Sequence, residues 1–210
     1  MYSPSYSREP DQAVVIDFMK QHPFAMLIGV DAETKPVATQ VPLFIDEREG
    51  TIYLTGHVQR KTDHCYAYEQ NSNVLAVFTG AHTYISASWY EDKQMASTWN
   101  YLSVHAKGVL RFLNDAELLE VLKRTTSHFE NDPHSPSLVE KMTDEYVAKN
   151  MKAIAAFEVE VTKLDAVFKL SQNRKEKDYD QIVGRLKEQG GEAAEVARLM
   201  EERKSNVFPS

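Results

Sequence analysis

Residues 81–105, AHTYISASWYEDKQMASTWNYLSVH, hold both tryptophans, Trp89 and Trp99, and carry the strongest fold signal in this chain. Each half alternates apolar and polar residues, which is the period of a β-strand. In the first half, Ile85, Ala87 and Trp89 share one side. The pattern predicts two strands joined by a charged connection, each with one face that carries aromatic rings, hydroxyls and imidazoles.

Two interpretations of this mixed face are open. It suits a ligand that is aromatic and also rich in hydrogen-bonding groups. It is also typical of the solvated outer face of an antiparallel sheet, which the pattern alone favours. The pattern by itself excludes neither.

The elements around this stretch follow from the same periodicities. Consecutive strands with helices inserted late favour an antiparallel α+β barrel over an alternating parallel sheet. Pro42 predicts that its strand lies at an edge or carries a bulge, and a change of apolar phase near Lys163 predicts a bulge or turn. The predicted elements are a helix from Asp11 that ends before His22–Pro23, strands over residues 24–30, 37–45 and 51–57, a helix up to Gln70, β-rich sequence over residues 73–113, a helix capped by Asn114 or Asp115, a helix from Ser135, a strand from Phe157, and two short helices around Gly190.

Length and composition predict one globular domain. A chain of 210 residues that is 42% hydrophobic can fill a single core. We expect a single split-barrel type of domain over residues 1–210, with residues 172–210 as a helical C-terminal extension.

The cellular compartment is predicted from three features. The single cysteine, Cys65, excludes an intrachain disulfide and agrees with a reducing compartment. No apolar run approaches the ~20 residues that cross a bilayer. Residues 1–10 are polar and lack the layout of a secretory signal. We therefore expect a cytoplasmic protein without a membrane span.

The formal net charge of −7 argues against direct DNA binding. Phosphate backbones repel such a chain unless a strong basic patch overcomes the field. The densest basic run, residues 174–178, is interrupted by acids. Direct binding to nucleic acid is therefore disfavoured.

The segment 55–62, TGHVQRKT, is the candidate phosphate anchor. A strand ends there and a helix starts, so free N–H groups and the helix dipole attract an anion. Arg60 and Lys61 add charge-assisted hydrogen bonds, and Thr55 and His57 lie on the strand that leads to them. The alternative is that both cations belong to a solvated turn.

Four ordered runs of sequence resemble the PaiB family of bacterial proteins. They are YISASWY over residues 84–90, TWNY over 98–101, KLSQNR over 169–174, and the opening Met1–Tyr2 with Pro4. Ala87 and Ser97 stand where the family pattern leads us to expect proline, and proline stiffens a strand end.

The resemblance implies an FMN-binding split-barrel fold, usually a homodimer with FMN at the subunit interface. It also implies a link to negative regulation of sporulation and degradative-enzyme genes. In related split barrels, a segment of hydroxyls and cations after this strand holds the FMN phosphate, which favours the anchor at residues 55–62.

The remaining candidate residues would surround the flavin ring. Gln40, Val41 and Pro42 would supply an apolar plane with amide and backbone groups; their alternative is an ordinary strand. Arg174 would close over a ligand, or else cap the following helix. Five more residues would line the rest of the flavin pocket; their alternative role is packing in the core or at an interface. They are Tyr84, Ser86, Trp99, Asn100 and Tyr101.

Motifs for other chemistry are missing. The chain has no phosphate-loop, dinucleotide, zincin or paired-cysteine pattern, so no metal site is expected, and no residue is an evident catalytic base. The leading hypothesis is a homodimeric FMN-binding protein with a flavin-linked role, including a possible flavin-dependent oxidoreductase. The alternatives are a regulatory or interaction protein with a degenerate flavin site, and a direct transcriptional regulator.

Overall fold

The computed structural model describes residues 1 and 3–209, so Tyr2 of the opening motif and Ser210 lie outside the described residues. The chain forms two compact units. The first unit contains residues 1–18, 79–104 and 165–210, and the second contains residues 19–78 and 105–164. The single-domain prediction, with its extension over residues 172–210, stays a prediction.

The strands of the described chain form one sheet in the order β2-β1-β5-β6-β7-β4-β3. The pairings of β1 with β2, β1 with β5, β3 with β4, and β4 with β7 are antiparallel. The predicted antiparallel α+β architecture is therefore confirmed. The strand bounds are β1 Phe24–Val30, β2 Pro36–Pro42, β3 Phe44–Arg48, β4 Thr51–Gln59, β5 Asn73–Ile85, β6 Thr98–Phe112 and β7 Ile154–Lys169.

The predicted strand over residues 37–45 is wrong as a single element. The structure divides it at Leu43 into β2 and β3, which lie at opposite ends of the strand order. Pro42 ends β2, and the N–H of Leu43 donates to the carbonyl of Pro23 instead of to a neighbouring strand (2.9 Å). Alternation continues across the break, so periodicity alone could not reveal it. The prediction that Pro42 lies on an edge strand is confirmed.

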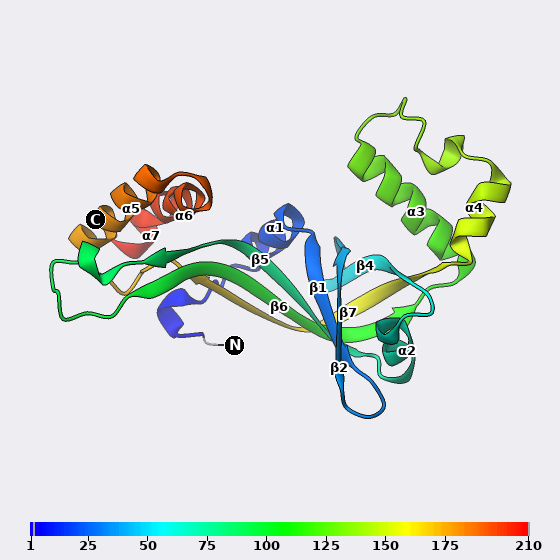
Figure 1. Cartoon of the computed structure of the whole chain (residues 1–210), viewed down its shortest axis with the longest axis horizontal. Helices are drawn as coiled ribbons and strands as arrows, with labels where there is room; N and C mark the ends of the chain where they lie inside the picture. The colour runs from blue at the N-terminus through cyan, green and yellow to red at the C-terminus, as the bar shows by residue number, and fades with distance from the viewer. Residues whose placement is uncertain (2, 210) are drawn as a thin grey trace. The chain divides into compact units, whose positions relative to one another are not determined.

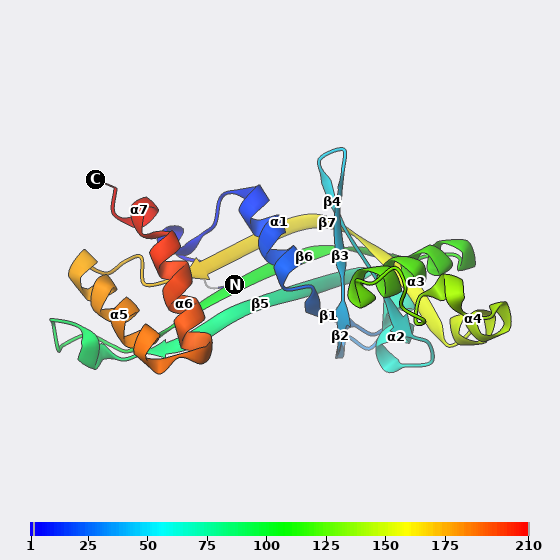
Figure 2. The ribbon, with the colours of Figure 1, turned by 90° about the horizontal axis from the view of Figure 1, so that it is seen from above.

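The helices of the second unit begin at good caps. Thr62 caps α2 (Asp63–Gln70), and Asn114 with Glu117 forms a capping box on α3 (Asp115–Glu130). α3 and α4 (Asp144–Met151) are grouped in Figures 1 and 2. Buried Leu118 and Val121 of α3 pack on Ala156 of β7, so α3 covers that face of the sheet.

The helix predicted from Ser135 begins later than expected. Val139–Lys141 is a short 3-10 turn, and α4 starts at Asp144, where the hydroxyl of Thr143 accepts from the N–H of Tyr146. This hydroxyl satisfies an N–H group of the first helical turn that has no partner within the helix.

The first unit joins the two ends of the chain. α1 (Gln12–Gln21) begins in it and ends in the second unit, and its first turn is capped by Asp11, as predicted. Arg8 forms an isolated antiparallel bridge with Val167 of β7. α5 (Glu176–Gln189), α6 (Gly191–Glu202) and α7 (Lys204–Val207) are grouped in Figure 1. The hydroxyl of Tyr179 donates to the carbonyl of Met200 and fastens α5 to α6 (2.7 Å).

One local prediction in the first unit and one in the second are corrected. The strand alternation ends at Ile85, and Ala87–Trp89 form a 3-10 turn in which the N–H of Ser88 donates to the hydroxyl of Ser86. β7 continues as a strand through Lys163, so the turn expected there is wrong, while the alternative of a bulge stays a prediction. The phase change there coincides with the border between the units after Leu164.

None of the helices in the described part of the chain has both the length and the apolar character required to span a membrane.

Candidate functional site

The junction between β4 and α2 holds the two predicted cations of the phosphate anchor. The Nε of Arg60 donates to the carbonyl of Ile154 (2.7 Å), and its backbone N–H donates to the carbonyl of Ala153 (2.8 Å). Arg60 is thus fixed against the start of β7. Lys61 follows with a φ of 59°, a left-handed conformation that is uncommon outside glycine. The junction is therefore a turn fixed by hydrogen bonds to the start of β7.

The charges at this junction remain available. Among the described residues, no carboxylate forms an ion pair with Arg60 or Lys61. Asp63 in the first turn of α2 instead accepts from the N–H of His64 (2.7 Å). Because the Arg60 fork has five N–H donors and its Nε uses one, its terminal nitrogens can receive an anion.

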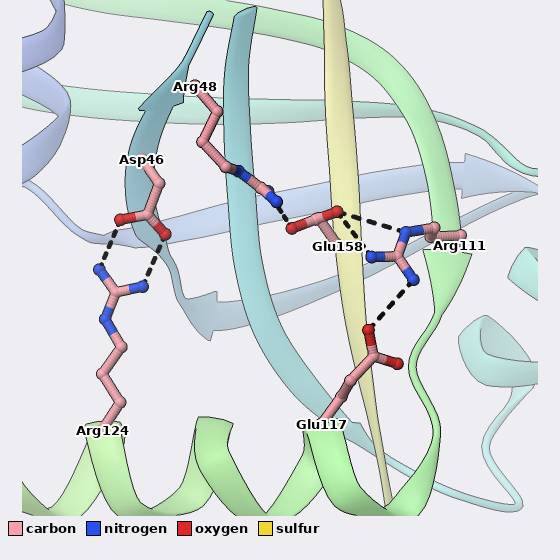
Figure 3. Close-up of polar contacts among 6 residues, drawn as sticks. All are labelled: Asp46, Arg48, Arg111, Glu117, Arg124 and Glu158. Atoms are coloured by element: carbon pink, nitrogen blue, oxygen red, sulfur yellow. Dashed lines mark hydrogen bonds and ion pairs between the residues drawn. The ribbon is translucent and has the colours of Figure 1, made fainter.

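Thr55 and His57 lie on β4 where it pairs with β7. Thr55 is buried opposite Glu158 of β7, and His57 is opposite Ala156. Glu158 is itself held by Arg48 and Arg111 (Figure 3). Burial lowers the pKa of His57 from 6.5, so the neutral imidazole is favoured there.

The end of β2 places the predicted flavin-ring residues on two faces. Val41 points into the core, whereas Gln40 is exposed and Pro42 is half-buried. Their β1 partners are Met26, opposite Gln40, and Phe24, opposite Pro42. Met26 is 41% exposed and Phe24 is 61% exposed, so this face is an uncovered apolar surface beside an amide. Sequence analysis missed both residues, although the strand at residues 24–30 is apolar on both faces.

Gly56 connects the two parts of the predicted site. A Cβ atom there would lie 3.0 Å from the carbonyl oxygen of Pro42 and 3.2 Å from Cζ of Phe157. The end of β2 can therefore approach β4 because residue 56 has no side chain. The ring segment and the phosphate segment are neighbours in the second unit.

The sequence runs that carry the family resemblance meet in the first unit. Lys169 donates to the hydroxyl of Thr98, which joins β7 to β6. The hydroxyl of Ser171 donates to Oδ1 of buried Asn100 (3.0 Å), and the amide nitrogen of Asn100 faces the sulfur of Met200 (3.5 Å). Asn100 is fully buried, so its polar atoms serve the interior of this unit.

Arg174 belongs to the same cluster of motifs. Its guanidinium carbon lies 4.5 Å from the ring centre of Tyr90, a cation–π distance. The Nε of Arg174 and the hydroxyl of Tyr90 are buried atoms without a hydrogen-bond partner among the described residues. Burial raises the pKa of Tyr90, and the cation of Arg174 opposes that rise.

The outer face of β5 and β6 in this unit is aromatic. Trp99 is 51% exposed, and its ring centre lies 5.7 Å from that of His82 and 6.2 Å from that of Tyr84, which is 47% exposed. Tyr101 lies further along β6 with Lys169 6.0 Å from its ring centre. The hydroxyl of Ser86 is used locally as the cap of the 3-10 turn.

The two departures from the family pattern compensate each other. The backbone N–H of Ala87 donates to the hydroxyl of Ser97 (2.9 Å), across the loop between β5 and β6. A proline at residue 87 would have no N–H to donate. A hydrogen bond between residues 87 and 97 thus restrains the loop where two prolines were expected.

The thirteen predicted residues divide between the units. Those of the phosphate and ring segments lie in the second unit: Gln40, Val41, Pro42, Thr55, His57, Arg60 and Lys61. The others lie in the first unit: Tyr84, Ser86, Trp99, Asn100, Tyr101 and Arg174. Four cavities are lined by described residues of the second unit, and of the predicted residues only Pro42 lines one of them. Within the described part of the chain, no cluster of three or more His, Cys, Asp or Glu could hold a metal ion.

Comparison with known proteins identifies relatives of the whole chain. The model of a family described as "Putative FMN-binding domain" matches residues 1–163. The chain is 32% identical over 204 residues to the protease synthase and sporulation protein PAI 2 of Bacillus subtilis, and the match covers 97% of this chain and 98% of that protein. The predicted PaiB resemblance is confirmed.

Solved structures show the same fold at low identity. A protein of Mycobacterium smegmatis that binds FAD and haem matches with a TM-score of 0.59 at 16% identity, over 78% of this chain and 73% of that one. A flavocytochrome of Azotobacter vinelandii matches with a TM-score of 0.54 at 18% identity, over 83% and 75%. The predicted split-barrel fold is confirmed.

Proposed function

We propose, because this chain belongs to the family of FMN-binding domains matched above, that Arg60 and Lys61 grip the phosphate of its FMN. FMN is the cofactor of the chain, and when bound it supplies transfer of electrons or hydride. The protein contributes binding, orientation and electrostatics.

The fixed guanidinium of Arg60 carries this proposal. Its Nε is committed to the carbonyl of Ile154, while its terminal nitrogens have no partner among the described residues. A side chain held in this way loses little rotamer freedom when it binds an anion, so more of the interaction energy appears as affinity. Lys61 adds a second cation, and the start of α2 adds its dipole.

The surface next to this anchor fits the flavin ring. An isoalloxazine needs an apolar plane with polar groups at its pyrimidine edge. Phe24, Met26 and Pro42 supply exposed apolar surface on one face of β1 and β2, and Gln40 supplies an amide. The contact of Pro42 with Gly56 keeps this surface beside β4. Val41 and Asn100 are not assigned to the flavin because both are buried away from any surface.

We further propose that the protein is a homodimer in which the second copy completes the flavin pocket. The exposed rings of Trp99 and Tyr84 on β5 and β6 support this assignment, since aromatic side chains are enriched at protein interfaces. A role in regulation is favoured by the name of the Bacillus relative, which refers to protease synthesis and sporulation. The reducing compartment indicated by the single cysteine supports a cytoplasmic location.

Comparing FMN with riboflavin tests the phosphate anchor. Riboflavin has the same ring without the phosphate, so R60A and K61A should weaken FMN and leave riboflavin unchanged. Each lost charge-assisted hydrogen bond is worth roughly 1.5–3 kcal/mol, or about 10- to 100-fold in Kd. Quenching of flavin fluorescence measures both constants, and K35A removes an exposed lysine elsewhere as the control. Equal FMN affinity in wild type and R60A would contradict the assignment.

The regulatory alternative has a degenerate flavin site. Purified protein whose absorbance corresponds to about one flavin per chain would support the flavoprotein. Colourless protein that takes up no added FMN would support the alternative. A gel shift with promoter DNA tests direct transcriptional regulation. The net charge of −7 makes us expect no specific, salt-sensitive shift.

A further inference from the structure

A cavity of about 250 Å³ lies in the second unit, between β3, the end of α1 and the last turns of α3. Its aromatic lining is Phe44 of β3 with His128 and Phe129 of α3. His128 meets Phe44 edge-on at 5.4 Å between ring centres and Phe129 at 4.9 Å. Prolines and aliphatic side chains complete the wall, so most of the lining is apolar.

The charged groups of this cavity are cations. Lys20 and Arg124 line it, and no aspartate or glutamate does among its described lining residues. Arg124 is held by Asp46 in a two-point contact (2.6 and 2.8 Å), which Figure 3 shows, and its guanidinium lies over the Phe44 ring at 4.1 Å. The Arg124 side chain is therefore held in place at the side of the cavity. The ammonium of Lys20 has no partner among the described residues.

Phe129 leaves part of this aromatic wall uncovered. It is 52% exposed at the end of α3, while Phe44 beneath it is buried. An exposed phenyl ring beside a concave surface with an unpaired cation is suited to a flat ligand that carries a negative charge. The size of the cavity admits one or two fused rings.

We propose that this cavity binds a small aromatic carboxylate. The ring lies against Phe129 and His128, and the carboxylate meets the ammonium of Lys20. Two N–H groups of the Arg124 fork serve Asp46, and its other donors add positive field at the rim. Neither Arg60 nor Lys61 of the proposed phosphate anchor is among the described residues that line this cavity; of the residues assigned above to the flavin, Pro42 alone contributes to its wall.

Binding of 2-naphthoate to the full-length protein tests the proposal. Saturation-transfer NMR and titration calorimetry on protein with and without FMN should show binding in both, so a negative result would leave the FMN assignment intact. We expect K20Q to weaken 2-naphthoate about tenfold, as one charge-assisted contact is lost, and F129A to weaken it by a similar factor. The imidazole resonances of His128 should shift on binding.

Controls separate the cavity from general surface binding. K35Q removes another exposed lysine, and Y146A removes an aromatic ring that is 56% exposed on α4; both should bind 2-naphthoate like wild type. Because Lys20 and Phe129 are exposed, their variants should fold. 2-Naphthylmethylamine reverses the charge and should not compete.

Three results would overturn the proposal. The first is absence of 2-naphthoate binding by wild type at millimolar concentration, and the second is equal affinity of K20Q, F129A and wild type. The third is self-association of the protein that F129A abolishes while no acid binds, which would make a second copy the occupant of this surface.

Discussion

Adding one methyl group at Gly108 should destabilise the protein strongly. Gly108 lies on β6 next to β7, and its φ is not in the left-handed region. The requirement for glycine is therefore steric. A Cβ atom there would lie 2.3 Å from the carbonyl oxygen of Glu160 and 2.6 Å from Cγ1 of Val159.

The size of the effect follows from these distances. A relaxed contact between carbon and oxygen is roughly 3.3 Å or longer, so β6 and β7 would have to separate locally by about 1 Å. The obstacle is backbone, which cannot rotate away as a side chain does. Overpacking costs about 1–3 kcal/mol, and one strained inter-strand hydrogen bond adds about 1 kcal/mol. We expect G108A to lose about 2–4 kcal/mol of unfolding free energy.

Urea unfolding followed by circular dichroism measures this loss, and G184A is its matched control. Gly184 lies in α5 with no atom within 4 Å of an added Cβ, so alanine there should stabilise the protein by about 1 kcal/mol. The two substitutions add the same atom and should act in opposite directions. An unfolding free energy of G108A within about 1 kcal/mol of wild type would show that the strands accommodate the methyl group and that the steric argument is wrong.

Three further predictions concern the second unit. E158Q should lower the unfolding free energy by about 2 kcal/mol, since it removes the negative charge between Arg48 and Arg111; the exposure of both arginines keeps this loss below that of a fully buried pair. Added salt should reduce the difference in unfolding free energy between E158Q and wild type. A loss equal to that of R48A alone would contradict the shared role of Glu158. N114A should cost about 1 kcal/mol in thermal unfolding through loss of the α3 capping box, whereas N114D should retain most of it. Because burial lowers the folded pKa of His57 below 6.5, the unfolded chain binds the proton first, so stability should fall as pH drops below 6.5 and level off below the folded pKa; in H57Q this part of the pH dependence should vanish, and an unchanged slope would contradict it.

Local pattern predicted much of the secondary structure. The strand Phe24–Val30 has the expected bounds, and helix starts at Asp11 and Asn114 are marked by side chains that satisfy free N–H groups. The antiparallel arrangement followed from strands that succeed each other along the chain. Such signals are local, because period and capping depend on residues within a few positions.

The polar faces of the strands and the cations that follow a strand end could be read from the amino-acid order alone, since both depend on neighbours in the chain. Three other features could be known only from the tertiary structure. The run at residues 37–45 breaks at Leu43 into strands at opposite edges of the sheet, and the side chain of Asn100 is buried against Ser171. Phe24 is exposed beside Pro42. These outcomes depend on which distant strand or helix covers a given face. Burial of apolar surface between distant segments selects that partner, and no periodicity in the chain encodes it.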